Sequence, residues 1–253
     1  MGDIEMILTA SSSFSYPKEV NRGNQDSILP VKKISDGFIM AVADGVGSYV
    51  GADFASRLAI SYLENIHSIS DFADVEYAFE NIRNILKAQA SDIGSEVMKM
   101  ASTTLTFCVI KKEGLIVGHV GDCRLYLKSE NKLKQLTKDH TRHQMLIDEG
   151  VFTARQLKGK SGKNILTTAI SVSSEIEMNY DIFFVPNEQL DFIDGTITLY
   201  IMSDGAHALW EKTPRFSFNT MNNISKFTNS LYRRIERNGP VDDYSLVGAT
   251  ISL

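Results

Sequence analysis

Short apolar and β-branched runs, each bounded by Gly, Asp, Asn or Lys, are the feature that most constrains the fold of this chain. They have the length of strands rather than of helices, which favours a β-rich centre. Turn signals such as Lys112-Glu113-Gly114 and Ser129-Glu130-Asn131 place several of them in antiparallel neighbours joined by short loops. We predict strands over 38–43, 103–110, 115–120, 124–127, 197–202 and 245–251.

Apolar residues at helical spacing mark three further segments, over 52–66, 75–86 and 224–235. The last segment is followed by Asn238-Gly239-Pro240, which supplies a left-handed cap and then forbids continuation of the helix. Strands, a helix pair, more strands and a late helix predict an α+β fold: a central antiparallel β-sandwich flanked by helices on both sides, in α-β-β-α layers. A chain of 253 residues can still close around one core, so we expect 1–253 to form a single domain.

Composition and charge exclude several classes of protein. Hydrophobic residues are 43% and charged residues 23%, unlike a disordered, collagen-like or coiled-coil chain. The 26 Lys and Arg against 31 Asp and Glu leave no basic footprint, so we expect no nucleic-acid partner. No run approaches the ~18 apolar residues of a membrane span. With Asp3 and Glu5 where a signal peptide carries Lys or Arg, we expect a cytoplasmic protein whose Cys108 and Cys123 are core residues.

Aspartates at the ends of predicted strands are the candidate functional residues. Asp44 and Asp204 follow strands and precede glycines, Asp26 follows Asn24-Gln25, and Asp242 precedes the last strand. Carboxylates that face a shared crevice would bind Mg²⁺ or Mn²⁺, which relieves their mutual repulsion and lowers the pKa of water at the ion. Taken singly, each Asp-Gly pair is better explained as an ordinary turn.

The order of the motifs along the chain is more specific than any one of them. From about residue 21 to 251 they resemble the metal-dependent protein phosphatase family, protein phosphatase 2C, in its compact bacterial form. The segments that carry the resemblance are Asn24-Gln25-Asp26, Val42-Ala43-Asp44-Gly45-Val46-Gly47, Ala101-Ser102-Thr103-Thr104-Leu105, His119-Val120-Gly121-Asp122-Cys123-Arg124-Leu125-Tyr126, Leu136-Thr137-Lys138-Asp139-His140-Thr141, Ile201-Met202-Ser203-Asp204-Gly205 and Val241-Asp242-Asp243-Tyr244-Ser245. The resemblance implies hydrolysis of phosphoserine and phosphothreonine in proteins, opposing a Ser/Thr kinase.

The resemblance also implies a role for each matching residue. Asp44 would bridge two Mn²⁺ or Mg²⁺ ions, the carbonyl of Gly45 would bind one of them, and Asp204 and Asp242 would bind the other. Asp26 would coordinate directly or through water. A water or hydroxide bridging the two ions would attack phosphorus in line, so no protein nucleophile is required.

Two departures from the family pattern affect the substrate and a third ion. Asn21 stands where many members carry the Arg that clamps the phosphate, and we assign that role to the adjacent Arg22. Ala208 stands where members carry an Asp that holds a third, weaker ion together with the position of Asp122. Asp122 is therefore a candidate third-ion ligand that lacks its usual partner.

Other motif residues receive ordinary structural interpretations. At the start of the last strand we place Asp242 on the metal and Asp243 in the position of a family Asn, so we expect Asp243→Asn to be tolerated. His119 is expected to be a satisfied core histidine and His140 to order a loop. The basic segment 158–163 is interpreted as a flexible, solvated turn.

Two function classes remain open from the sequence. One is an active metal-dependent phosphatase, and the other is a phosphatase-fold regulatory or phosphoprotein-binding module with little turnover. A hydrolase of small phosphoesters is a weaker third. Every position that matches a ligand of the two-ion site keeps its residue, which favours the enzyme. We expect the protein to be a monomer.

Overall fold

Two five-stranded antiparallel sheets form the centre of this computed structural model, which describes residues 6–47 and 51–252. Asp3 and Glu5, from which a cytoplasmic protein was expected, lie outside the described residues. The first sheet has the order β1 (Ile7–Tyr16), β12 (Tyr244–Ser252), β11 (Thr196–Met202), β7 (Arg124–Ser129), β8 (Lys132–Gln135). The second has the order β10 (Asp181–Pro186), β6 (Gly114–Val120), β5 (Leu105–Lys111), β3 (Gly37–Asp44), β2 (Asp26–Ile34). A small separate pair joins β4 (Ser102–Thr103) to β9 (Ile170–Ser171).

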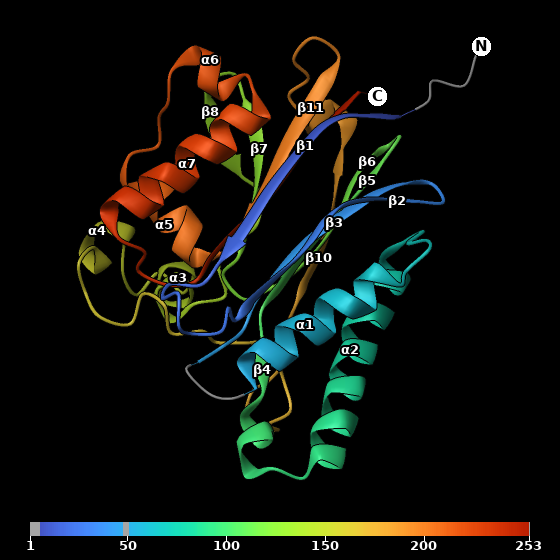
Figure 1. Cartoon of the computed structure of the whole chain (residues 1–253), viewed down its shortest axis with the longest axis vertical. Helices are drawn as coiled ribbons and strands as arrows, with labels where there is room; N and C mark the ends of the chain where they lie inside the picture. The colour runs from blue at the N-terminus through green and yellow to red at the C-terminus, as the bar shows by residue number, and fades with distance from the viewer. Residues whose placement is uncertain (1–5, 48–50, 253) are drawn as a thin grey trace.

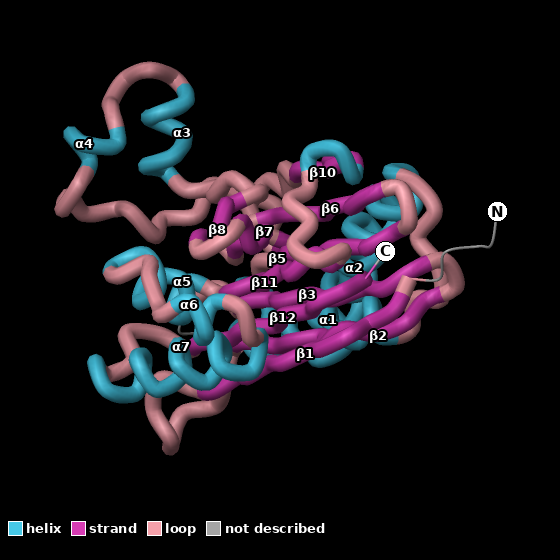
Figure 2. The backbone as a smooth tube through the Cα atoms, turned by 90° about the horizontal axis from the view of Figure 1, so that it is seen from above, coloured by secondary structure: helices cyan, strands magenta, loops and turns pink. Residues whose placement is uncertain are grey.

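Helices cover the outer face of each sheet (Figure 1). The second sheet is covered by α1 (Ala52–Glu64) and α2 (Phe72–Ile93), and the first by α5 (Asp204–Lys212), α6 (Phe218–Met221) and α7 (Ile224–Asn238). Two short helices, α3 (Arg142–Asp148) and α4 (Ala154–Leu157), project beyond the sheets (Figure 2). Short 3₁₀ turns occur at Glu96–Met100 and Asn187–Gln189. The α-β-β-α layering confirms the predicted fold class.

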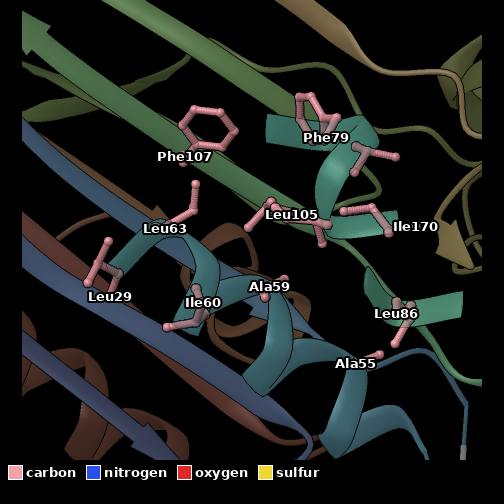
Figure 3. Packing of buried hydrophobic residues seen from close by; sticks show 14 of the residues in the cluster. Leu29, Ala55, Ala59, Ile60, Leu63, Phe79, Leu86, Leu105, Phe107 and Ile170 are labelled. Carbon is pink, nitrogen blue, oxygen red and sulfur yellow. The ribbon is translucent and has the colours of Figure 1, made fainter. Parts of the chain in front are cut away.

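Three apolar clusters hold these layers together. Met40, Val117 and Ile201 belong to the cluster between the two sheets. The cluster under α1 and α2 interleaves side chains such as Leu63 of α1 with Phe107 of β5 (Figure 3). Strands buried on both faces become almost continuous apolar runs in the sequence, which is why the central strands were predicted. Among the described residues, no helix combines the length and the hydropathy needed to span a membrane.

Most predicted strands lie within one or two residues of the observed ones. The helix predicted over 75–86 is longer than expected, since α2 runs from Phe72 to Ile93. The predicted strand 103–110 is interrupted at Thr104, whose backbone N–H donates instead to the carbonyl of Asp44 at 2.8 Å. The predicted strand 124–127 extends to Ser129. The helix over 224–235 ends as expected, since Gly239 has a φ of 79°. No strand or helix was predicted at β1, β2, β8, β9, β10, α3, α4, α5 or α6.

Candidate active site

A cavity of about 260 Å³ opens at the end of the sandwich where strands of both sheets begin or end. A larger groove of about 550 Å³ between α1 and α2 contains none of the predicted site residues. The smaller cavity contains most of them, which makes it the candidate site. It is lined by Lys18, Arg22, Gln25, Asp44, Gly45, Val46, Gly47, Thr104, Asp122, Asn164, Leu166, Asp204, Asp242 and Asp243.

The β2–β3 ladder brings the first two aspartates together. Asp26 begins β2, Asp44 ends β3, and the two residues are direct partners in the antiparallel register. Thr104 fixes the backbone of Asp44 from the other side, since its Oγ1 accepts from the Asp44 N–H at 3.0 Å. Two acids 18 positions apart in sequence are thus held at one edge of the cavity.

Gly45 allows the end of β3 to approach the start of α1. A Cβ at this position would lie 2.5 Å from the carbonyl oxygen of Ala52, closer than side-chain atoms pack. The Gly45 N–H donates to the carbonyl of Gln25 at 3.1 Å. The glycine therefore keeps the backbone after Asp44 at the wall of the cavity, where the sequence places a carbonyl ligand.

The side of the cavity that belongs to the first sheet is built by α5 and the loop before β12. Asp204 is the first residue of α5, so the Asp-Gly pair expected to form a turn begins a helix instead. A Cβ on Gly205 would lie 2.1 Å from the carbonyl oxygen of Asp243, so the first turn of α5 rests directly on the backbone of the β12 loop. This contact sets the position of Asp204 relative to Asp242.

Burial and mutual repulsion raise the pKa values of four of the carboxyl groups. Burial is the main cause in each case. It raises the pKa of Asp26 to about 7, of Asp122 to about 8 and of Asp204 to about 6. The pKa of Asp44 is also raised well above its ordinary value, by burial and then by Asp26, Asp204, Asp122 and Asp242. Ionising all of these carboxyl groups together is unfavourable unless a bound cation neutralises part of their charge.

Two carboxylate oxygens without hydrogen-bond partners also indicate a cation site. Oδ1 of Asp26 and Oδ1 of Asp204 are buried and have no hydrogen-bond partner within the described part of the chain. Oδ2 of Asp26 accepts from Ser203 Oγ at 2.7 Å, which orients that carboxylate. Within the same residues, no three His, Cys, Asp or Glu side chains converge tightly enough to form a ready-made ion site. Carboxylate oxygens are nevertheless the type of ligand that Mn²⁺ and Mg²⁺ prefer, and the two Oδ1 atoms have no other partner among the described residues.

Asp243 has the hydrogen-bonding role expected of the family Asn position, but it uses both of its carboxylate oxygens. Its Oδ1 accepts from the Lys18 N–H and its Oδ2 from the Gln25 N–H, each at 2.7 Å, and its side chain is buried. The carboxylate thus ties both ends of the loop that carries Arg22 to the start of β12. An Asn can accept only one of these bonds, which argues against the expectation that Asp243→Asn is tolerated, and we now expect this change to lower stability.

Positive and polar groups surround the carboxylates. Arg22 lines the cavity, as the clamp assignment requires, and donates to the side chain of Gln25. Lys18, Asn164 and Leu166 also line it and were missed by the sequence analysis. Asn164 Nδ2 donates to Asp204 Oδ2 at 3.3 Å. The segment around Asn164 contains no motif that predicts a site residue. The basic run at 158–163 was the only feature of the sequence nearby that could have drawn attention to it.

The histidines and cysteines have structural roles. His119 is buried, with Nδ1 on Thr106 Oγ1 at 2.8 Å and Nε2 on the Lys138 carbonyl at 2.9 Å, and burial lowers its pKa to about 4. His140 accepts from the Gly121 N–H at 3.2 Å and so orders the turn that carries Asp122. Burial raises the pKa of both thiols, which are core groups and not nucleophiles.

Comparison with known proteins identifies the same family that the motifs resemble. The family described as "Protein phosphatase 2C" matches residues 18–247, and the chain belongs to that family. A relative named "Serine/threonine phosphatase stp" from Listeria welshimeri is 29% identical over 176 residues, which cover 66% of this chain and 66% of that protein. The match thus spans just under two thirds of the relative's length.

Solved structures share the fold at low sequence identity. The crystal structure of the serine/threonine phosphatase PstP/Ppp from Mycobacterium tuberculosis has a TM-score of 0.74 and 22% identity, covering 98% of this chain and 99% of that one. Stp1 from Staphylococcus aureus has a TM-score of 0.77 and 17% identity, covering 98% and 95%. The catalytic domain of PstP in complex with two manganese ions has a TM-score of 0.71 and 23% identity, covering 98% and 100%.

Proposed function

We propose that this protein hydrolyses phosphoserine and phosphothreonine in proteins with the help of two divalent ions. The carrying observation is the set of aspartates from both sheets at one cavity: Asp44, Asp122, Asp204 and Asp242 line it, and the buried Asp26 pairs with Asp44. Within the described residues, Oδ1 of Asp26 and Oδ1 of Asp204 have no hydrogen-bond partner. Family membership and the names of the relatives support the same activity.

The described residues suggest how the site holds its ions. Asp44, at the junction of β3 with the cavity, is the proposed bridging ligand, with the Gly45 carbonyl beside it. Asp204 and Asp242 would hold the second ion, and Asp26 would bind directly or through water. When bound, two Mn²⁺ or Mg²⁺ ions would polarise the phosphoryl oxygens and lower the pKa of water enough for attack near neutral pH.

The protein's own groups would orient the substrate. Arg22 and Lys18 lie at the cavity wall and would hold the phosphate, while Asp243 fixes the loop that presents them. Asp122 would be the ligand of a third, weaker ion, and with Ala208 in place of a carboxylate we expect two ions to suffice. His207 Nε2 lies 3.1 Å from the Asp122 carbonyl and fixes that backbone.

A phosphothreonine peptide assayed with Mn²⁺, with Mg²⁺ and with excess chelator tests the function. We expect phosphate release only with a divalent ion, and a loss of at least ~100-fold in Asp44→Ala, since it removes a ligand shared by both ions. The exposed Asp191→Asn serves as the control for charge. Full turnover in chelator would refute the two-ion site. Tight binding of phosphopeptide without turnover would instead favour the regulatory or phosphoprotein-binding module, and turnover of p-nitrophenyl phosphate alone would favour a hydrolase of small phosphoesters.

The cellular setting follows from the same proposal. We propose that 1–253 acts as a single catalytic domain and as a monomer in the cytoplasm, where it opposes a Ser/Thr kinase. The three apolar clusters share the same two sheets, which supports one cooperative unit. Gel filtration with light scattering tests the oligomeric state.

A further inference from the structure

A projecting arm beside the cavity, residues 142–163, carries charge opposite to that of the protein as a whole. The chain has a net charge of −5, yet the only acids of the arm are Asp148 and Glu149 at the end of α3, and no further Asp or Glu occurs before Glu175. That stretch contains four exposed cations, Arg155, Lys158, Lys160 and Lys163. None of the four forms an ion pair with another described residue. The arm is therefore a local basic surface on an acidic protein.

Hydrogen bonds within the arm flank the exposed turn that was expected over 158–163. Thr153 and Gln156 form a reciprocal capping box at the start of α4. His143 Nε2 lies 2.9 Å from the Ser161 carbonyl, and the Lys160 N–H donates to the Leu157 carbonyl at 3.0 Å. Leu157 is buried between the exposed cations. These contacts hold the cations in a defined place.

The base of the arm joins it to the candidate site. The Arg142 N–H donates to the Ile165 carbonyl at 2.8 Å, and Thr141 and Leu166 form an isolated bridge. Leu166 and Asn164 line the cavity. Arg155, Lys158 and Lys160 do not line it, and Figure 2 shows α3 and α4 standing away from the sheets. The outer cations are thus placed to meet residues next to a bound phosphate rather than the phosphate itself.

We propose that the arm binds acidic residues flanking the phosphorylated Ser or Thr, with Lys158 and Lys160 as the principal contacts; this rests on the proposed function. The exposed cations of the arm would attract a phosphoprotein segment with acidic flanks and raise its local concentration next to the cavity. Exposed Val151 and Phe152 on the same arm add apolar contact area for the segment. Charge complementarity therefore selects an acidic phosphoprotein as the occupant.

Binding of non-hydrolysable peptides tests the arm apart from the catalytic reaction. Three fluorescent peptides would carry a phosphonate analogue of phosphothreonine followed by three Glu, three Gln or three Lys, and anisotropy with Mn²⁺ would give Kd. Because exposed ion pairs contribute little each, we expect the Glu peptide to bind on the order of fivefold tighter than the Gln peptide. This preference should decline as salt rises from 0.1 to about 1 M, where the screening length falls from ~10 to ~3 Å.

Matched double variants assign the preference to the arm. Lys158→Gln with Lys160→Gln should bring the ratio of the two Kd values close to one. Lys132→Gln with Lys134→Gln on β8 makes the same charge change at the same spacing on exposed residues and should leave the ratio unchanged. Both double variants should retain the wild-type rate with p-nitrophenyl phosphate.

Three outcomes would overturn the inference. The wild type could bind the Glu and Gln peptides with equal affinity. The preference for the Glu peptide could remain after both arm lysines are replaced, or it could fall equally in the arm and the β8 double variants. Stronger competition by a short DNA duplex than by an unphosphorylated Glu peptide would assign the arm to nucleic acid. Failure of the proposed function would appear separately, as no hydrolysis of the matching phosphothreonine peptides, whereas the Kd comparison would still decide the role of the arm.

Discussion

Asp243→Asn removes one oxygen from a buried carboxylate that holds two backbone N–H groups. In the wild type both oxygens accept at 2.7 Å, from Lys18 and from Gln25. An Asn presents one oxygen and one NH₂ group, so one of the two backbone donors would face another donor. The change keeps the shape of the side chain and isolates the effect of the second acceptor.

The expected cost follows from these contacts. A hydrogen bond to a charged group contributes ~1.5–3 kcal/mol, and a buried donor left without a partner adds to the loss. Removing one negative charge offsets part of it, because Asp243 is among the groups that raise the pKa of Asp26. We expect a net loss of about 2 kcal/mol, which for a chain of this length lowers Tm by roughly 4–8 °C.

Urea unfolding and calorimetry of the metal-free protein would measure this loss, and hydrogen exchange would locate it. The amides of Lys18 and Gln25 should lose protection in Asp243→Asn, while the exposed control Asp191→Asn should match the wild type. If Asp243→Asn stays within ~0.5 kcal/mol of the wild type, the value typical of a surface change, and both amides stay protected, the carboxylate does not hold the loop.

Three further results are expected. Asp242→Asn should weaken Mn²⁺ affinity and lower turnover by at least ~10-fold, and a Mn²⁺ titration that shows neither would remove Asp242 from the ligand set. Gly205→Ala should lower Tm and Mn²⁺ affinity together, because its Cβ would lie 2.1 Å from the Asp243 carbonyl oxygen; wild-type values for both would contradict the close packing of α5. Burial raises the pKa of Asp26 to about 7 and of Asp204 to about 6, so the folded metal-free protein binds protons more tightly than the unfolded chain. Its stability should therefore be greatest in acid with respect to these groups and fall as pH rises from about 4, the unfolded pKa, to about 8, the raised pKa of Asp122. Urea unfolding in chelator from pH 5 to 8 that shows no such fall would contradict the raised pKa values.

The sequence by itself determined the central strands and the nature of the ligands. Strands such as β3 and β6 are buried on both faces, so their apolar runs are visible without any partner. Asp44, Asp204 and Asp242 were recognisable because each stands at one end of such a run, whereas Asp26 was recognisable only as part of Asn24-Gln25-Asp26. Gly239 was recognisable because few other residues end a helix with a positive φ.

Elements at the edge of a sheet or at a helix start were harder to predict. β1 is an edge strand whose inward positions alternate only weakly in the sequence, because Ser12 interrupts the apolar Leu8, Ala10 and Phe14. α5 begins at an Asp-Gly pair, and this local signal favours a turn. A helix forms there because Gly205 packs against the β12 loop, a contact that the local sequence does not encode.

Only the tertiary structure decided how the ligands meet and which groups hold them. The pairing of Asp26 with Asp44 depends on the register of β2 against β3, and the approach of Asp204 depends on how the two sheets stack. Lys18 and Asn164 reach the cavity from loops whose paths are set by contacts with Asp243 and Asp204. A sequence specifies which side chains can bind a cation, but the distances between residues far apart along the chain are fixed by long-range packing and hydrogen bonding.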